Sequence, residues 1–316
     1  MVITDNNQQV TSPTVSVIMN CFNSAQYLKE AIDSVYAQTY KDWEIIFWDN
    51  ASTDNSHQIA QSYGEKLRYF RSQETVNIGK ARNLALNKAQ GKYIAFLDCD
   101  DLWLPEKLEK QIVLFEKNPK VGLVFCDTIL FDDKGNKYQL YKRNVPFKGR
   151  VFRKLLERYY LSMETVVIRK DSLNVLAEWF DERFNMVEEA DLFTRIAYAW
   201  EFDYVPQALA MWRIRPTSLT FVKKHLFPQE GELQLEKYIK LYPGFDEDYS
   251  KEIQKMKAKI QYQYALLDWE KGEDSSVRRR LSPYLFTQKK YVIPYIFSFF
   301  PYKFYSRIFN RRALGA

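Results

Sequence analysis

The sequence predicts an α/β protein with a doubly wound, mostly parallel sheet and a C-terminal helical extension. Over the first half of the chain, short apolar runs alternate with segments of helical periodicity. The run at 93–97 lacks polar alternation and ends in Asp98-Cys99-Asp100-Asp101. Such a run is typical of a strand buried on both faces, which carries its acids to the carboxyl edge of a parallel sheet. Beyond about Val222 the sequence becomes charged and helical.

The first 97 residues predict four strands with helices between them. Apolar residues at helical spacing after the first strand predict a helix that Asn23 or Ser24 caps at its amino end. A turn-rich segment follows the second strand and leads into a helix that ends near Tyr63. Gly91 is expected to stop a third helix. The predicted strands are 15–19, 43–48, 67–71 and 93–97, and the third helix is 80–89.

The rest of the chain predicts a more mixed arrangement. A hairpin turn is expected at 132–136. The expected helices are 105–117, 189–200 and 250–271, and the expected strands are 121–126, 165–168 and 208–214. We expect a domain boundary near Val222, which divides the chain into a domain of residues 1–222 and a helical extension of residues 223–316.

Three carboxylates stand together after the fourth predicted strand. Close packing of Asp98, Asp100 and Asp101 raises the pKa of each carboxyl unless a cation neutralises the charge. Because the chain has two histidines and three cysteines without C-x-x-C spacing, zinc is disfavoured, and an oxygen-coordinated divalent metal, Mg or Mn, is favoured. For Asp101 there is an alternative, the amino-terminal cap of the helix that follows.

Composition and charge narrow the class of protein. The chain has 316 residues, 46% of them hydrophobic, enough for a core domain with an extension. Residues 1–10 lack the basic start and apolar core of a secretory signal, and the three scattered cysteines suit a reducing compartment, so a cytoplasmic protein is expected. Residues 275–316 contain nine Lys or Arg and no acid, so the net charge of +6 is concentrated there.

The end of this basic segment mixes aromatic and aliphatic residues with Lys303, Arg307, Arg311 and Arg312. That mixture suits the surface of an anionic membrane, and prolines interrupt it well before the roughly 20 apolar residues that a spanning helix needs. We therefore expect a peripheral protein on the inner membrane surface. The alternative is a C-terminal helix pair docked on the first domain with its aromatics in the core. Nucleic acid is not expected, because no recognised nucleic-acid module accompanies the charge.

An ordered set of sequence blocks resembles the family 2 glycosyltransferases, nucleotide-sugar enzymes of the GT-A fold that build bacterial polysaccharides. The resemblance covers roughly residues 13–220. A lone D-x-D is weak evidence, whereas the whole series in this order is specific. The blocks are 15–23, 44–54, 77–83, the D-x-D at 98–100, an acidic pair at 188–189 ahead of a helix, and 212–220.

The resemblance implies roles for residues that follow the predicted strands. Asn20 and Phe22 are expected to surround the uracil or other base, and Asp49 to hydrogen-bond it. The family commonly has a Val-Asp-Asp-Gly-Ser type of segment there, and this chain has Trp-Asp-Asn-Ala-Ser, which keeps Asp49. Asp98 is expected near the ribose and the metal, and Asp100 as a direct metal ligand. A divalent metal there screens the diphosphate as negative charge develops on the leaving group.

Basic residues are expected at the donor diphosphate. Lys80 or Arg82 could meet it, and the alternative for both is a charge on a solvent-facing helix. Arg213 and Arg215 belong to a segment that closes over the donor phosphates in the family, and each offers a fork-shaped phosphate donor. The alternative for these two arginines is pairing with nearby acids.

A second acidic cluster precedes the helix at 189–200. The resembling family usually has a Glu-Asp pair here, and Glu189 occupies the position of its Asp. A Glu at that position can still take a proton from an acceptor hydroxyl. Glu189 is therefore the expected catalytic base, with Asp191 and Glu188 in reserve. The alternative is that these three acids serve the amino-terminal end of the helix.

The resemblance and the residues together predict an inverting, metal-dependent glycosyltransferase of the hexosyl type. Its donor is expected to be a nucleoside-diphosphate sugar, with UDP as the first choice, and its acceptor a glycan or lipid-linked glycan in cell-surface polysaccharide synthesis. A D-x-D phosphatase is disfavoured because the motif follows three earlier strands instead of the first. A non-catalytic membrane or glycan-binding protein on a transferase scaffold is the remaining alternative.

Overall fold

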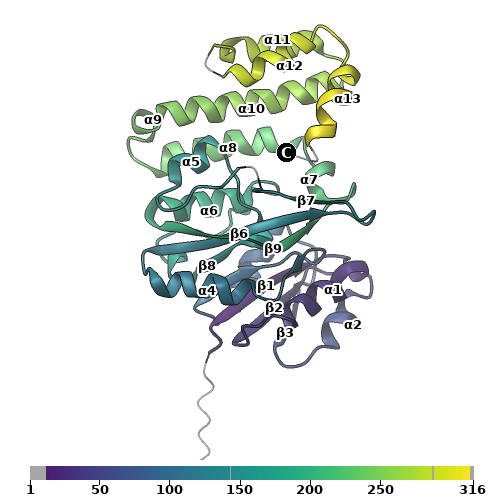
Figure 1. The fold of residues 1–316 in the computed structure, drawn as a ribbon, viewed down its shortest axis with the longest axis vertical. Coiled ribbons are helices and arrows are strands. Elements are labelled where there is room, and N and C mark those ends of the chain that lie inside the picture. The colour runs from purple at the N-terminus through teal and green to yellow at the C-terminus, as the bar shows by residue number, and fades with distance from the viewer. Residues whose placement is uncertain (1–11, 143, 287, 314–316) are drawn as a thin grey trace, which may run out of the picture.

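The computed structural model describes residues 12–142, 144–286 and 288–313, without the side chains of residues 309–313. Residues 1–10, from which the absence of a secretory signal was inferred, lie outside the described residues, as do the side chains of Arg311 and Arg312. Figure 1 shows a central sheet with helices on both sides and a stack of further helices above it.

The sheet has nine strands in the order β3-β2-β1-β4-β8-β6-β9-β5, with β7 paired to β6. Its first part is parallel, because β1 pairs with both β2 and β4, and β2 pairs with β3. These four strands confirm the predicted ones. Their bounds are β1 Val15–Cys21, β2 Trp43–Asp49, β3 Leu67–Arg71 and β4 Tyr93–Phe96.

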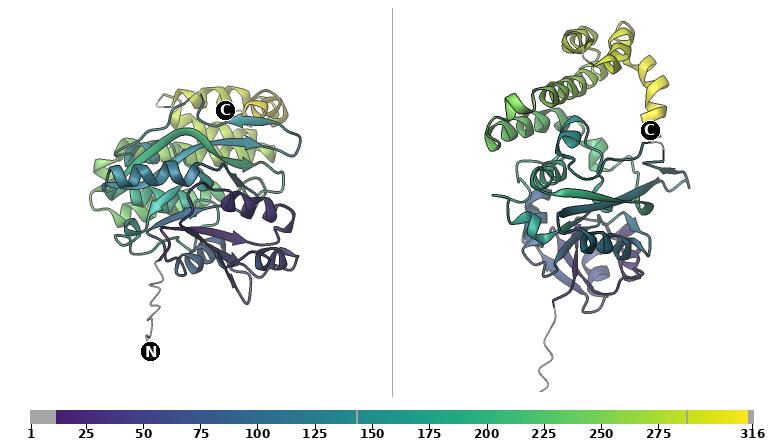
Figure 2. Two further views of the ribbon diagram at one scale, coloured as in Figure 1. Left: turned by 60° about the horizontal axis from the view of Figure 1, so that its bottom comes forward. Right: turned by 60° about the vertical axis from the view of Figure 1, so that its left-hand side comes forward.

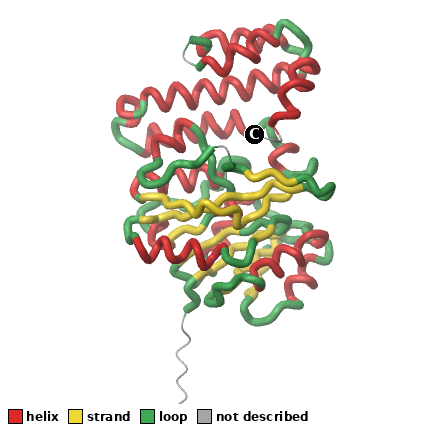
Figure 3. The backbone as a smooth tube through the Cα atoms, in the orientation of Figure 1, coloured by secondary structure: helices red, strands yellow, loops and turns green. Residues whose placement is uncertain are grey.

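The second part of the sheet mixes directions. β8 lies antiparallel between β4 and β6, β6 and β9 run parallel, and β5 adds antiparallel to β9. The expected hairpin turn joins β6 to β7. Figure 3 shows the strands as a continuous layer between helices. The bounds are β5 Leu102–Trp103, β6 Val121–Phe131, β7 Lys137–Gln139, β8 Val167–Arg169 and β9 Glu201–Arg213.

Helices cover both faces and separate two apolar cores. One core includes residues of α1 and α4, and the other includes residues of α3, α5 and α6. The apolar positions predicted for α1, from Tyr27 to Val35, are all buried. The helices are α1 Ala25–Tyr36, α2 Ser56–Gln61, α3 Ile78–Leu86, α4 Lys107–Lys117, α5 Phe152–Glu157 and α6 Glu188–Ala199, with 3-10 turns η1 Met163–Thr165 and η2 Lys170–Leu173.

One prediction about helix ends was confirmed in position only, and another was wrong. Ser24 is the N-cap residue of α1, but its side chain makes no capping bond; instead Asp54 accepts a hydrogen bond from the Ala25 N–H at 3.0 Å. Gly91 does not stop α3, which ends at Leu86 with Asn87 as its C-cap. Gly91 is required for close packing, because a Cβ there would lie 2.5 Å from the backbone nitrogen of Ser16 on β1.

The extension stacks above the sheet as successive helices (Figures 1 and 2). Leu235, Tyr238 and Met256 belong to the core on the α6 side of the sheet, so α8 and α10 pack directly on the first domain. The remaining helices have a core of their own around Trp269 and Tyr305. The short helix α7 Leu219–Val222 precedes the extension. The extension contains α8 Leu226–Leu241, α9 Phe245–Asp248, α10 Ser250–Glu270, α11 Asp274–Leu281, η3 Ser282–Tyr284, η4 Lys289–Tyr291, α12 Val292–Phe297 and α13 Tyr302–Ala313.

Candidate active site

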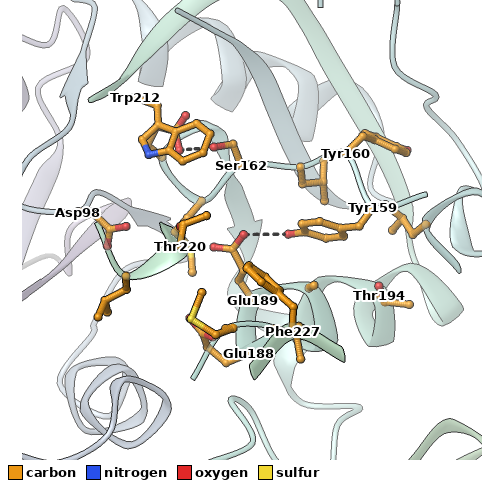
Figure 4. A pocket seen from close by; sticks show the side chains of 18 of the residues that line it. Asp98, Tyr159, Tyr160, Ser162, Glu188, Glu189, Thr194, Trp212, Thr220 and Phe227 are labelled. Atoms are coloured by element: carbon orange, nitrogen blue, oxygen red, sulfur yellow. Dashed lines mark hydrogen bonds between the residues drawn. The ribbon is translucent and has the colours of Figure 1, made fainter. Parts of the chain in front are cut away.

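A cavity of about 1330 Å³ lies between the sheet and the extension. One side, which we call the strand-end wall, contains residues at or just beyond the carboxyl ends of β1 and β4: Asn20, Phe22, Asp98 and Asp100. The other side, which we call the helical wall, contains Glu188 and Glu189 of α6 and residues of α8 and α10. Figure 4 shows Asp98, Glu189 and Trp212 around the same space.

Asp49 lies next to the strand-end wall but not on the cavity surface. It is fully buried and accepts hydrogen bonds of 2.6 Å from Tyr69 and from Arg71, and one of 2.7 Å from the Ser52 N–H. Ala51, where the family commonly has glycine, has a φ of 62°. That left-handed conformation explains the usual glycine, and the Asp49 bond to Ser52 helps to hold this turn.

The two basic residues predicted on α3 have different positions. Lys80 is exposed and does not line the cavity. Arg82 is buried and lines it; its guanidinium hydrogen-bonds Glu188 and reaches Asp98 at 3.4 Å. Arg82 therefore links the two walls, and the alternative of a solvent-facing helix charge does not apply to it.

The D-x-D carboxylates have different surroundings. The side chain of Asp98 is 41% exposed, whereas that of Asp100 is 20% exposed and forms an ion pair with Arg215. Burial and the charge of Asp98 raise the pKa of Asp100, and Arg215 opposes that rise. Asp101 is buried and accepts a hydrogen bond from the backbone N–H of Arg213 at 2.8 Å. The capping alternative for Asp101 was wrong, because α4 begins only at Lys107.

The two arginines near the end of β9 point in different directions. Arg215 lines the cavity, and Arg213 does not. The Arg213 guanidinium pairs with Glu30 at 2.9 Å and Asp133 at 3.0 Å, and it donates to the carbonyl of Asp100 at 2.9 Å. Both arginines therefore pair with nearby acids, Arg213 with Glu30 and Asp133 and Arg215 with Asp100, but only Arg215 does so at the cavity.

The carboxylates of the strand-end wall suit a hard divalent cation. Among the described residues, no three His, Cys, Asp or Glu side chains are grouped to hold a metal ion. Asp98 and Asp100 do line one cavity, and their charges repel each other. Mg²⁺ is commonly held by one or two carboxylates, with waters and substrate phosphates completing the coordination. Two carboxylates beside a cavity therefore fit Mg or Mn, provided that a phosphate supplies further ligands.

Glu189 lies in an environment that disfavours its charged form. Burial, followed by the charge of Glu188, raises the pKa of Glu189 to about 8, and Arg82 opposes the rise. The Tyr159 hydroxyl donates to Glu189 Oε1 at 3.4 Å (Figure 4). Burial also raises the pKa of Glu188, which pairs with Arg82. A carboxyl with a pKa near neutrality is well matched to proton transfer.

Asp191 is the third acid of the first turn of α6, and it does not line the cavity. It is fully buried, and it pairs with Arg195 at 2.8 Å and with Lys237 at 2.8 Å. Lys237, which belongs to α8, also pairs with Asp181 at 2.9 Å. Asp191 thus takes part in an ion network that ties α8 to α6.

Two further residues of the site were missed from the sequence. The carboxylate of Glu230 on α8 accepts hydrogen bonds from the backbone N–H groups of Asn185, Met186 and Val187, at 2.9, 2.8 and 3.1 Å. It therefore fixes the segment immediately before Glu188. Glu164 lines the cavity and is 2% exposed. Neither residue stands in a recognisable motif.

Comparison with known proteins identifies the family. The family described as glycosyl transferase family 2 matches residues 16–176. An uncharacterised glycosyltransferase of Methanocaldococcus jannaschii is 32% identical over 225 residues, which cover 68% of this chain and 77% of that protein. The chain belongs to glycosyl transferase family 2. This membership decides against the D-x-D phosphatase alternative.

This family 2 glycosyltransferase is also similar to a further relative and to solved structures. A putative teichuronic acid biosynthesis glycosyltransferase of Bacillus subtilis is 42% identical over 103 residues, 32% of this chain and 41% of that protein. TarS of S. aureus, solved in complex with UDP, has a TM-score of 0.55 at 19% identity and covers 87% of this chain and 92% of the TarS chain.

A mannosyltransferase from Pyrobaculum calidifontis, solved with GDP-Man and Mn²⁺, has a TM-score of 0.60 at 17% identity, covering 92% of this chain and 85% of that chain. At these identities the two structures establish the fold, which is the expected GT-A fold.

Proposed function

We propose that this glycosyltransferase inverts the anomeric carbon as it moves a sugar from a nucleoside-diphosphate sugar to a hydroxyl of a glycan or lipid-linked glycan. The observation that carries this proposal is that Glu189, with its raised pKa, lines the same cavity as Asp98 and Asp100. A base and a diphosphate site on opposite walls suit direct displacement between them. The named role of the Bacillus subtilis relative in teichuronic acid biosynthesis supports an acceptor in cell-surface polysaccharide synthesis.

The proposed step is a single displacement. Glu189 takes the proton of the acceptor hydroxyl, and the oxygen forms a bond to the anomeric carbon. The bond between that carbon and the diphosphate oxygen breaks, and the nucleoside diphosphate leaves with the electron pair. Tyr159 restrains the Glu189 carboxylate through its hydrogen bond, and Arg215 offers a guanidinium to the leaving diphosphate.

We propose that Asp98 and Asp100 hold a divalent metal, Mg or Mn. When bound, the metal would neutralise negative charge on the leaving diphosphate. The Mn²⁺ in the solved mannosyltransferase complex supports this choice. Before donor binds, Arg215 neutralises Asp100.

The donor nucleotide is proposed to lie along the strand-end wall. Asn20 and Phe22 line the cavity there, and Phe22 is 51% exposed, which leaves its ring free to stack on a base. Arg82 is proposed to act near the ribose and diphosphate. Asp49, which is fully buried, is proposed to reach the base only if donor binding opens the turn that Asp49 holds. UDP is the first choice, because TarS was solved with UDP and with UDP-GlcNAc. Lys80 and Arg213 are not part of this proposal.

Peripheral membrane association is also proposed. Among the described residues, none of the helices has the length and apolar character needed to cross a membrane. Aromatic residues of the tail are divided between two settings: Tyr291 and Tyr305 are buried in the core of the extension, and other apolar residues face solvent. We call the latter the C-terminal apolar face; its members are 47% to 63% exposed and comprise Ile293, Ile296, Phe299, Phe300, Phe304 and Ile308.

Calorimetric titration with UDP tests the donor site. The wild type is expected to bind UDP in the presence of Mn²⁺ and to bind it far more weakly without metal, and Asp100→Ala is expected to lose the metal-dependent part while keeping its fold. Metal-dependent binding would then justify a screen of UDP-sugars for transfer. If neither UDP nor dTDP- and GDP-sugars bind the wild type, the non-catalytic alternative replaces this proposal.

A further inference from the structure

The mouth of the cavity carries a cluster of positive charge from three distant parts of the chain. Arg158 follows α5, Lys259 belongs to α10 and Lys290 to η4. Arg158 and Lys259 line the cavity that contains Glu189. We call these three residues the basic rim. Lys290 does not line the cavity, but it is close enough to Arg158 for their charges to interact. The extension therefore supplies two of the three charges, and all three side chains are exposed.

The charges of the basic rim lack a neutralising partner among the described residues. Glu157 is the nearby acid, and it is already shared by Lys154 at 3.6 Å and Lys255 at 2.6 Å. Arg158, Lys259 and Lys290 take part in none of the ion pairs formed by the described residues. Burial and the charges of Arg158 and Lys255 lower the pKa of Lys290, and burial and Lys290 lower the pKa of Lys259. Cations that repel one another across a cavity mouth favour an anion between them.

Exposed apolar side chains lie on the same cavity surface as the rim. Val145 is 77% exposed and Phe147 is 53% exposed, and both line the cavity. Lys154, in the helix just before Arg158, places its ammonium group 5.1 Å from the centre of the Phe147 ring. The cavity mouth thus offers an apolar surface next to uncompensated positive charge, which is the chemistry of an amphiphilic anion.

We propose that the basic rim binds the phosphate or diphosphate of a lipid-linked acceptor, while the first part of the lipid chain contacts Val145 and Phe147. This inference rests on the proposed function, because it names the acceptor class for the same cavity. Arg158 and Lys259 are exposed and Glu189 is partly buried in the same cavity, so a sugar attached to the bound phosphate would extend from the rim toward the base. The lipid and the C-terminal apolar face would then meet the same membrane.

The test uses the full-length protein with its donor site filled by UDP and Mn²⁺, so that diphosphate probes are directed to the rim. The probes are inorganic diphosphate, farnesyl diphosphate and farnesol, titrated calorimetrically. The double variant Arg158→Gln, Lys259→Gln removes two charges of the rim, and Lys257→Gln, an exposed residue of α10 outside the cavity, is the matched control.

We expect farnesyl diphosphate to bind the wild type more tightly than inorganic diphosphate, and farnesol to bind least. The double variant should bind both diphosphates about tenfold more weakly, because each partly exposed charge contributes modestly, while Lys257→Gln should match the wild type. Equal binding of farnesyl diphosphate by the double variant and the wild type would overturn the rim site.

Equal affinity of the wild type for inorganic and farnesyl diphosphate would overturn the lipid contact. The variant Phe147→Ser checks that contact separately, since it should weaken the binding of farnesyl diphosphate and leave the binding of inorganic diphosphate unchanged. Failure of the proposed function would be recognised differently, as loss of UDP binding by the wild type. In that case, the difference in affinity for farnesyl diphosphate between the wild type and the double variant would still test the basic rim.

Discussion

The strand-end wall and the helical wall of the cavity differ in how their functional residues are positioned. On the strand-end wall, Asp98 and Asp100 follow β4 directly, so a short stretch of chain places both carboxylates. On the helical wall, Glu189 depends on Glu230, which is 45 residues beyond Asn185 and belongs to the extension. Sequence motifs therefore describe the first wall well, whereas the second is specified by tertiary contacts between α6, α8 and α10.

The largest expected effect comes from separating two acids of α6. Glu189→Gln should lower kcat by about 10²–10⁴-fold with little change in stability, because it removes the base but keeps the shape of the side chain. Asp191→Asn should instead destabilise the fold by about 3–5 kcal/mol, because it breaks a buried ion pair. Steady-state kinetics and thermal unfolding of both variants distinguish the two roles; a Glu189→Gln enzyme with normal kcat would remove Glu189 as the base.

Glu230 provides the second test, since it is proposed to act through its hold on the segment before Glu188. Glu230→Gln should lower kcat by about 10²-fold, because small displacements of a catalytic group are costly, and it should change the KM for donor much less. Glu236→Gln, an exposed residue of the same helix, is the control. Partial recovery of kcat in Glu230→Asp would separate positioning from a general loss of folding.

The contrast between the walls explains what the sequence could predict. The apolar run before Asp98 and the helical period after Glu189 are local patterns, and both elements formed as expected. Whether Arg213 or Arg215 faces the cavity depends on ion pairs with Glu30 and Asp133 far away in the chain. Local patterns carry no information about such partners, so the direction of each guanidinium could not be predicted.

The same limit applies to three other features of the site. Asp101 resembles a helix cap in sequence, yet in the fold it accepts a bond from β9, which comes over a hundred residues later. Glu230 is one of many acids in a charged helix, and only the approach of α8 to Asn185 gives it a role. Lys290 likewise joins the basic rim only because the fold brings its charge near those of Arg158 and Lys255.

The strand-end wall is tested by the two arginines near the end of β9. Arg215→Gln should weaken donor binding by about 10–100-fold, as expected for a charged hydrogen bond to phosphate, with stability preserved. Arg213→Gln should cost about 1–3 kcal/mol of stability and leave the donor affinity of the folded protein near normal. UDP calorimetry with parallel thermal unfolding gives both quantities, and the reverse pattern would exchange their proposed roles.

The pH dependence reports directly on the helical wall. Glu189 must be deprotonated to act as a base, and its pKa is raised to about 8, so kcat/KM of the free enzyme should fall about tenfold for each pH unit below that value. Activity is thus gained as pH rises through about 8 and lost as pH falls. The rate should be followed from pH 6 to 9 at fixed metal and ionic strength. A kcat/KM that does not change between pH 6 and 9 would contradict the perturbed environment of Glu189.

The smallest expected effect concerns the C-terminal apolar face, which lies away from both walls. Lys303 is exposed between Phe300 and Phe304, so Lys303→Gln should weaken binding to anionic vesicles about fivefold, as expected for one cation near a charged bilayer. Phe299→Ser should weaken binding to neutral and anionic vesicles alike, because it removes apolar contact. Vesicle co-sedimentation measures both effects.

Val175→Ser provides a control for this last comparison, because Val175 is 60% exposed on the first domain, outside the C-terminal apolar face. It should leave vesicle binding unchanged, and all three variants should keep wild-type UDP affinity, since none of them lines the cavity. If Phe299→Ser and Val175→Ser both bind vesicles as well as the wild type does, the exposed aromatic residues do not hold the protein at the membrane. Membrane attachment would then have to arise from the lipid-linked acceptor at the basic rim alone.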